Sequence, residues 1–120
     1  MIFKMNKLKI MTVIGTRPEI IKLSRIIPKL DLFFDHLLVN TSQNFDYELN
    51  KIFFNDLNIR KPDVELKIQA KSAAKTIAKV IDEIDTLIKK HTPDAFLILG
   101  DTNSCLSCIS AKRNKVPIFH

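Results

Sequence analysis

The chain of 120 residues contains only two glycines, two cysteines, one tyrosine and no tryptophan. With Gly15 and Gly100 as its glycines, it cannot hold the Gly-x-Gly-x-x-Gly fingerprint of dinucleotide-binding folds or a Walker phosphate loop. It also lacks any apolar run approaching the roughly 18 residues that a membrane-spanning helix needs. At 46% hydrophobic residues, the chain has enough apolar material for one core.

Secretion signals and metal sites are not indicated either. The start of the chain scatters lysines among apolar residues and lacks the ordered regions of a signal peptide, so we expect a cytoplasmic protein. Cys105 and Cys108 have the C-x-x-C spacing of redox sites, but a helix beginning around Thr102 would place Cys105 a turn inside it. We therefore expect two buried, reduced cysteines, and the three histidines show no metal-ligand spacing.

Basic residues outnumber acidic ones, giving a formal net charge of +6. Lys71, Lys75 and Lys79 would form a basic line on one helix face, each four residues from the next. Acidic residues follow this line directly, and no aromatic residues alternate with the lysines as a base-stacking surface requires. We expect a solvated face with a mild preference for phosphorylated ligands, and no nucleic-acid partner.

Two hydrophobic periods alternate along the chain. Short apolar runs predict strands at Leu8–Ile14, His36–Asn40, Val64–Leu66, Ala95–Leu99 and Val116–Phe119. Helical spacing predicts helices at Arg17–Leu32, Asp46–Leu57, Ala73 to about His91, and Thr102 to about Asn114. This alternation implies right-handed βαβ crossovers, and hence an α/β fold with a Rossmann-like parallel sheet and helices on both faces.

The segment Gly15-Thr16-Arg17-Pro18-Glu19 joins the first strand to the first helix. Thr16 and Glu19 have the spacing of a capping box, and Pro18 lies in the first turn, where its missing N–H is not needed. Arg17 then lies at the positive end of a helix dipole, a place where phosphates tend to bind in open α/β sheets. The alternative is a well-capped helix with a solvated arginine.

Gly100-Asp101-Thr102 repeats this pattern after the fourth strand. If the first and fourth strands are neighbours, the Asp101 carboxylate faces the same crevice as Arg17; otherwise Asp101 serves as the N-cap of the next helix. Lys22 lies within the first two helical turns, and the polar loop holding Gln43 offers amides and hydroxyls suited to sugar contacts. Both of these signals are weak.

Together, the run Met11–Leu23 resembles the opening signature of the non-hydrolysing UDP-N-acetylglucosamine 2-epimerases. Pro93-Asp94 before a strand that ends in Gly100-Asp101-Thr102, followed by Val116–His120, matches later landmarks of this family in order and spacing. The resemblance covers nearly the whole chain. The first signature is specific and the later landmarks are moderately so.

The resemblance implies two Rossmann-like domains facing a cleft, the glycosyltransferase-B architecture, in a homodimer. Residues 1–120 would form a partial N-terminal domain, with the C-terminal nucleotide-binding domain absent. The family inverts C2 of a UDP-linked N-acetylhexosamine, without NAD or metal, by eliminating UDP to a glycal and adding it back. The implied role is the synthesis of surface polysaccharide precursors from a UDP-sugar substrate, and we expect the chain alone to be inactive.

The resemblance also implies roles for individual residues. Asp101 matches a catalytic carboxylate, and Arg17 matches the arginine that contacts the nucleotide diphosphate. Lys22, Gln43 and Thr102 fall on the substrate-binding side, and the next catalytic glutamate would lie just beyond His120.

The loop after Gln43 departs from the commonest epimerases. The run Asn44–Asn50 resembles the branch that forms UDP-N-acetyl-L-fucosamine by C2 epimerisation of a 6-deoxy-talosamine precursor. The sequence thus leaves the sugar open. A glycosyltransferase of the same fold and a non-catalytic remnant or binding module are further alternatives.

Overall fold

The computed structural model describes residues 7–41, 47–100 and 102–120. The strands are β1 (Lys9–Ile14), β2 (Asp35–Asn40), β3 (Val64–Glu65), β4 (Ala95–Ile98) and β5 (Ile118–Phe119). They form one parallel sheet in the order β3-β2-β1-β4-β5. This order, with the first strand central, confirms the predicted Rossmann-like α/β fold.

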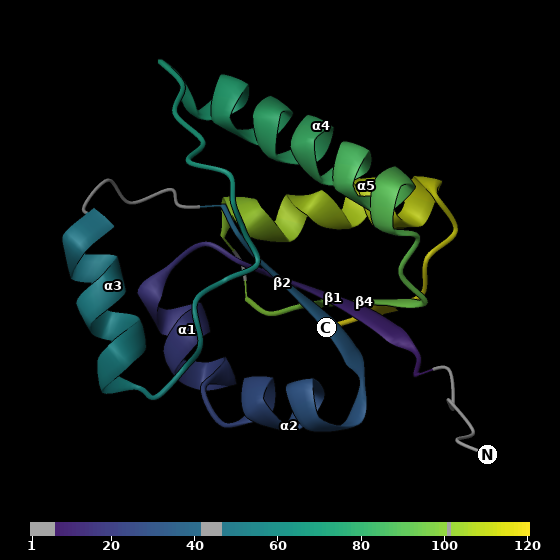
Figure 1. Ribbon diagram of the computed structural model, residues 1–120. Helices are drawn as coiled ribbons and strands as arrows, with labels where there is room; N and C mark the ends of the chain where they lie inside the picture. The colour runs from purple at the N-terminus through teal and green to yellow at the C-terminus, as the bar shows by residue number, and fades with distance from the viewer. Residues whose placement is uncertain (1–6, 42–46, 101) are drawn as a thin grey trace.

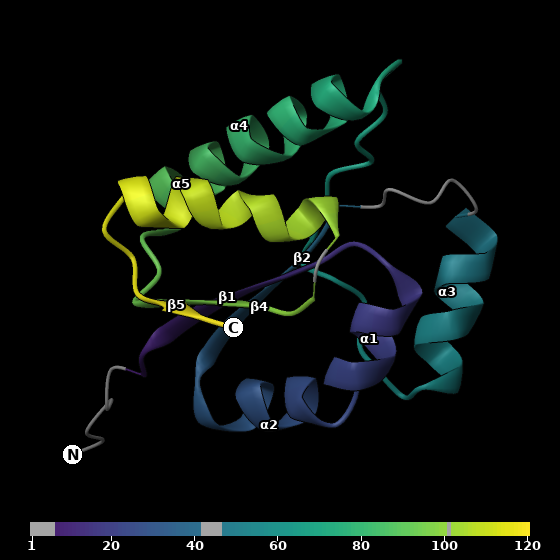
Figure 2. The ribbon, with the colours of Figure 1, turned by 180° about the vertical axis from the view of Figure 1, so that it is seen from behind.

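Helices cover both faces of the sheet, as predicted (Figure 1). One face carries α1 (Arg17–Leu23), α2 (Ile26–Phe33) and α3 (Tyr47–Asp56). The other carries α4 (Ala73–His91), the 3₁₀ helix η1 (Asn103–Ser107) and α5 (Cys108–Arg113), and Figure 2 shows the two layers from behind. No helix in the described part of the chain is long and apolar enough to cross a membrane.

The central strand β1 contributes to a core on each face because its side chains alternate in direction. Met11 and Val13 pack with α4 and α5, whereas Ile14 packs with α1, α2 and α3. All three side chains are completely buried. Burial on both faces explains why β1 reads as a continuous apolar run rather than an alternating one.

The amphipathic pattern of α4 is confirmed. Its buried stripe is Val80, Ile84 and Ile88. The Lys75 amide donates to the Ser72 hydroxyl at 3.2 Å, which caps the start of the helix. The three lysines of the predicted basic line are exposed, but Lys71 precedes the N-cap Ser72, so only Lys75 and Lys79 of this line lie on α4.

The predicted helix Arg17–Leu32 is two helices, so this expectation was wrong. The chain breaks at Ser24 and Arg25, between α1 and α2. Pro28 explains the break, because an uninterrupted helix would require its missing N–H to donate to the Ser24 carbonyl and would press its ring against that oxygen. The break places Pro28 in the first turn of α2, where no N–H is needed.

The last helix also differs from prediction, because it begins as η1 with Thr102 as N-cap and becomes α-helical only at Cys108. Both cysteines are half-buried rather than buried. Three serines spaced three residues apart take the inward positions instead: Ser104, Ser107 and Ser110. The period of a 3₁₀ helix places Ser104 and Ser107 on one side of η1, and Ser110 in α5 is buried as well, which leaves the cysteines beside this line.

Candidate functional site

The carboxyl ends of β1 and β4 lie side by side. The two strands pair directly, with Val13 opposite Ile98, so the turns that begin at Gly15 and Gly100 leave the sheet next to each other. β5 ends at the same edge, where the His120 ring lies 3.1 Å from the Gly100 carbonyl oxygen. The condition for a shared crevice, that the first and fourth strands are neighbours, is therefore met.

Arg17 begins α1, directly after the N-cap Thr16. Its guanidinium carbon lies 5.8 Å from the centre of the Phe53 ring of α3, a cation–π contact that orients a positive charge without neutralising it. The Nε atom is buried and has no hydrogen-bond partner among the described residues. No ion pair of Arg17 is found among these residues either. The geometry thus leaves a cation at the sheet edge that an anion could pair with.

Glu19 lies in the first turn of α1 and is only 3% exposed. Its Oε2 accepts from the Gly15 amide at 2.6 Å and from the Thr16 amide at 3.1 Å. Its Oε1 accepts from the Ser104 hydroxyl at 2.8 Å and from the Thr102 hydroxyl. These five residues are called the Glu19 cluster below.

The capping box predicted from Thr16 and Glu19 is present. The well-formed part is the bond from the Thr16 amide to the Glu19 carboxylate. The Thr16 hydroxyl oxygen faces the Glu19 amide but has no hydrogen-bond partner among the described residues. The carboxylate therefore does most of the capping.

The turn after β4 depends on a glycine. Gly100 has φ of +96°, a backbone conformation that residues with a Cβ rarely adopt. Thr102 is half-buried, and its hydroxyl also lies 2.7 Å from the Ser104 hydroxyl. The predicted catalytic Asp101 lies outside the described residues, as does Gln43.

The structure brings some predicted site residues together and not others. Arg17 and Thr102 belong to turns that the Glu19 cluster joins. Lys22 is exposed on α1 and makes no described contact with either turn. Sequence reasoning missed Glu19 as a link between the turns, together with Ser104 and His120. The capping spacing pointed to Glu19, but only the strand order shows what else its carboxylate reaches.

A second polar cluster lies near the amino end of β2, and no sequence motif pointed to it. The His36 ring is bonded through Nδ1 to Asp31 at 2.7 Å and through Nε2 to the Thr12 hydroxyl at 2.7 Å. Arg60 donates to Asp31 at 3.0 Å and to Asp63 at 2.9 Å. Burial lowers the pKa of His36, although the hydrogen bond to Asp31 opposes this shift.

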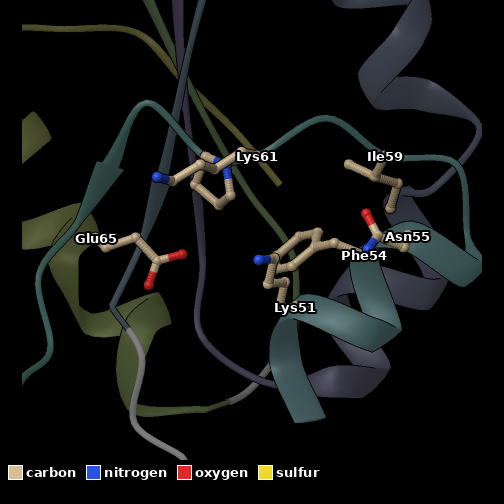
Figure 3. Close-up of a pocket in the computed structure, with 7 residues that line it drawn as sticks. Lys51, Phe54, Asn55, Ile59, Lys61 and Glu65 are labelled. Atoms are coloured by element: carbon tan, nitrogen blue, oxygen red, sulfur yellow. The ribbon is translucent and has the colours of Figure 1, made fainter. Parts of the chain in front are cut away.

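A cavity of about 210 Å³ lies beside the edge strand β3, where α3 and the segment before β3 meet (Figure 3). The charged side chains Lys51, Lys61 and Glu65 line it, and in Figure 3 their charged ends lie around the same space. Phe54, Ile59 and Pro62 provide apolar walls, and Asn55 completes the lining. This cavity shares no lining residue with the Glu19 cluster. No group of three or more metal-ligating side chains is found within the described ranges.

Comparison with known proteins decides the family. The family model described as UDP-N-acetylglucosamine 2-epimerase matches residues 29–120. The chain belongs to this family. The resemblance seen in the sequence motifs is therefore confirmed, while the fucosamine-forming branch is not resolved.

Three relatives of the family are informative. The structure of UDP-N-acetylglucosamine 2-epimerase from Rickettsia bellii is 54% identical, with a TM-score of 0.87 over 95% of this chain and 30% of that one. The Methanocaldococcus jannaschii UDP-GlcNAc 2-epimerase, solved in complex with UDP-GlcNAc and UDP, is 35% identical, with a TM-score of 0.86 over 94% of this chain and 32% of that one.

The third relative has a different sugar in its name. UDP-2,3-diacetamido-2,3-dideoxy-D-glucuronate 2-epimerase from Pseudomonas aeruginosa is 36% identical over 94% of this chain and 33% of its own length. The chain thus spans about a third of the length of the relatives that it matches.

Proposed function

We propose that residues 1–120 form a partial N-terminal domain of a UDP-N-acetylhexosamine 2-epimerase. In this proposal the carboxyl edge of the sheet is one wall of an active-site cleft, and a second nucleotide-binding domain forms the other wall in a glycosyltransferase-B architecture. The family match and the relative solved with UDP-GlcNAc and UDP support a UDP-sugar substrate.

One observation carries the proposal: the Arg17 guanidinium at the start of α1 has no anionic partner among the described residues. Its buried Nε lacks a hydrogen-bond acceptor among these residues, whereas buried polar atoms are normally hydrogen-bonded. The start of a helix adds its own partial positive charge. A diphosphate oxygen satisfies both, since it is an anion and a strong hydrogen-bond acceptor.

The chemistry needs such a cation. The C2 proton of the sugar is weakly acidic, so its removal is assisted when the C1–oxygen bond breaks and its electrons leave with UDP. A fixed positive charge stabilises the charge that develops on the leaving diphosphate. Re-addition of UDP to the glycal, with a proton delivered to the opposite face of C2, completes an epimerisation that needs no net oxidation or reduction.

The remaining roles stay predictions. Asp101 would exchange the C2 proton as a general acid or base, for which it must come within hydrogen-bond reach of that carbon. Lys22, Gln43 and Thr102 would bind the UDP-sugar. A homodimer is expected for the complete protein.

The test uses a fusion protein, called the hybrid below. It joins residues 1–120 in frame to the remaining two-thirds of the Rickettsia bellii relative. Proton–deuterium exchange at C2 of UDP-N-acetylglucosamine in heavy water is followed by NMR. We expect exchange by the hybrid and none by the chain alone. Enzyme-like exchange by the chain alone would show that the N-terminal side of the cleft suffices for catalysis. A folded hybrid without exchange would favour a non-catalytic binding module.

Two variants of the hybrid isolate the cation. Arg17→Ala should lower the exchange rate by about 10²–10³, the usual effect of removing one preorganised group that stabilises developing negative charge. Arg25→Ala removes an exposed arginine between α1 and α2 and is the matched control. Equal rates for both variants contradict the role of Arg17.

The sugar is a separate question. Relatives of about 35% identity have names that give different UDP-sugars, whereas the 54% identical Rickettsia bellii relative is named for UDP-N-acetylglucosamine. Offering the hybrid UDP-N-acetylglucosamine, its 2,3-diacetamido glucuronate counterpart and the 6-deoxy-talosamine precursor of UDP-N-acetyl-L-fucosamine compares the candidates directly. Fast exchange with only the last sugar assigns the chain to the fucosamine-forming branch.

A further inference from the structure

We propose that Glu19 is a positioning residue that sets the distance between the Arg17 turn and the turn after β4. This inference rests on the proposed function, because it concerns how the two turns at the carboxyl edge of the sheet are held in a fixed relative position. Glu19 does not touch the reacting atoms in this proposal. It acts through the four other residues of the Glu19 cluster.

The hydrogen-bond acceptors of Glu19 are divided between the two turns. Among the described residues, Oε2 accepts from the backbone amides of Gly15 and Thr16, which follow β1. Within the same part of the chain, Oε1 accepts from the hydroxyls of Thr102 and Ser104, which lie 83 and 85 residues further along the sequence. An ionised carboxylate is the side chain suited to this place, because it accepts on both oxygens and donates nothing.

Burial makes the arrangement rigid. Glu19 is 3% exposed and Ser104 is completely buried, so water cannot easily replace either partner. Loss of the carboxylate would leave four buried or half-buried donors to find new acceptors. The Gly100 backbone also lies against Glu19, since a Cβ added there would be 3.7 Å from both Cγ and Oε1.

This use of Glu19 explains how an acidic residue can lie two positions from Arg17 without cancelling its charge. The carboxylate is turned inward and saturated by four donors, while the guanidinium contacts Phe53 on α3. The residue between Gly100 and Thr102 in the sequence is the predicted catalytic acid. A change in the position of that turn by about 1 Å can therefore cost on the order of 100-fold in rate, as for other misplaced catalytic groups.

The first experiment measures the link in the 120-residue chain itself. Urea unfolding is followed for the wild type, Glu19→Gln, Ser104→Ala and the double variant. We expect the loss of stability in the double variant to be clearly smaller than the sum of the two single losses, because Glu19→Gln replaces the charged acceptor and Ser104→Ala removes the donor of the same bond. Additive losses would overturn the proposal, whatever the activity of the complete enzyme.

The second experiment measures positioning in the hybrid. Ser104→Ala removes one donor to Glu19 at a place that substrate cannot reach, and we expect kcat to fall about 10- to 100-fold with KM within a factor of about three. Ser107→Ala is the matched control, because this buried hydroxyl donates to the Ser104 carbonyl within η1 and makes no described bond to Glu19. Glu19→Asp keeps the charge but shortens the side chain, and should behave like Ser104→Ala.

A rise in KM with unchanged kcat in Ser104→Ala, or equal effects of Ser104→Ala and Ser107→Ala, contradicts positioning. If the unmodified hybrid is inactive, the proposed function fails, and the unfolding experiment on the chain still decides whether Glu19 joins the two turns.

Discussion

His36 makes this protein less stable as the pH falls. Its side chain is 1% exposed, and burial, partly opposed by Asp31, holds its pKa below the ordinary value of 6.5. Both ring nitrogens are satisfied in the neutral form, since Nδ1–H donates to Asp31 and Nε2 accepts from the Thr12 hydroxyl. A proton on Nε2 would face the hydroxyl that now donates to it.

The direction and size of the effect follow from proton linkage. Because the pKa is lower in the folded state, the unfolded chain binds the proton first as the pH decreases. The stabilisation is fully present above pH 6.5 and is lost as the pH falls from there through the lowered pKa of the folded state. One such group changes the free energy of unfolding by at most about 1.4 kcal/mol per pH unit within this window.

The assay is urea unfolding followed by far-UV circular dichroism between about pH 5 and pH 7.5, for the wild type and His36→Gln. The substitution removes the titrating ring and leaves an amide that can still donate to Asp31. We expect the stability difference between the two proteins to shrink steadily below pH 6.5. His120→Gln, at an exposed histidine, controls for the loss of a ring. Parallel pH curves for wild type and His36→Gln would refute the reasoning.

Three further changes test the fold by the same unfolding measurement. Ile84→Ala, which opens a cavity at a completely buried position of α4, should cost about 2–5 kcal/mol, and a loss below 1 kcal/mol would contradict its place in the core. Ser72→Ala should cost about 0.5–2 kcal/mol through loss of the bond that caps α4. Thr92→Gly should instead stabilise the chain by about 1 kcal/mol, because the β-branched Thr92 ends α4 with φ of +46°; destabilisation would show that its side chain has another role.

The sequence by itself determined the class of fold and most of its elements. The apolar run of β1, the stripe of α4 and the alternation of strands with helices are local periodicities, so they could be read without knowing any long-range contact. The family signature around Arg17 was readable for the same reason, because it is contiguous. The break before α2 also has a local signal, Pro28, but the apolar residues on both sides keep helical spacing and so predicted one continuous helix.

Only the tertiary structure decided which turns meet. Strand order brings Gly15 beside Gly100, and a single buried carboxylate then joins residues 83 and 85 positions apart. Local spacing shows Glu19 as a cap, since its contacts with Gly15 and Thr16 lie within one helical turn. Its contacts with Thr102 and Ser104, like those of His36 with Asp31 and Thr12, depend on packing energy summed over the whole sheet, which no short stretch of sequence contains.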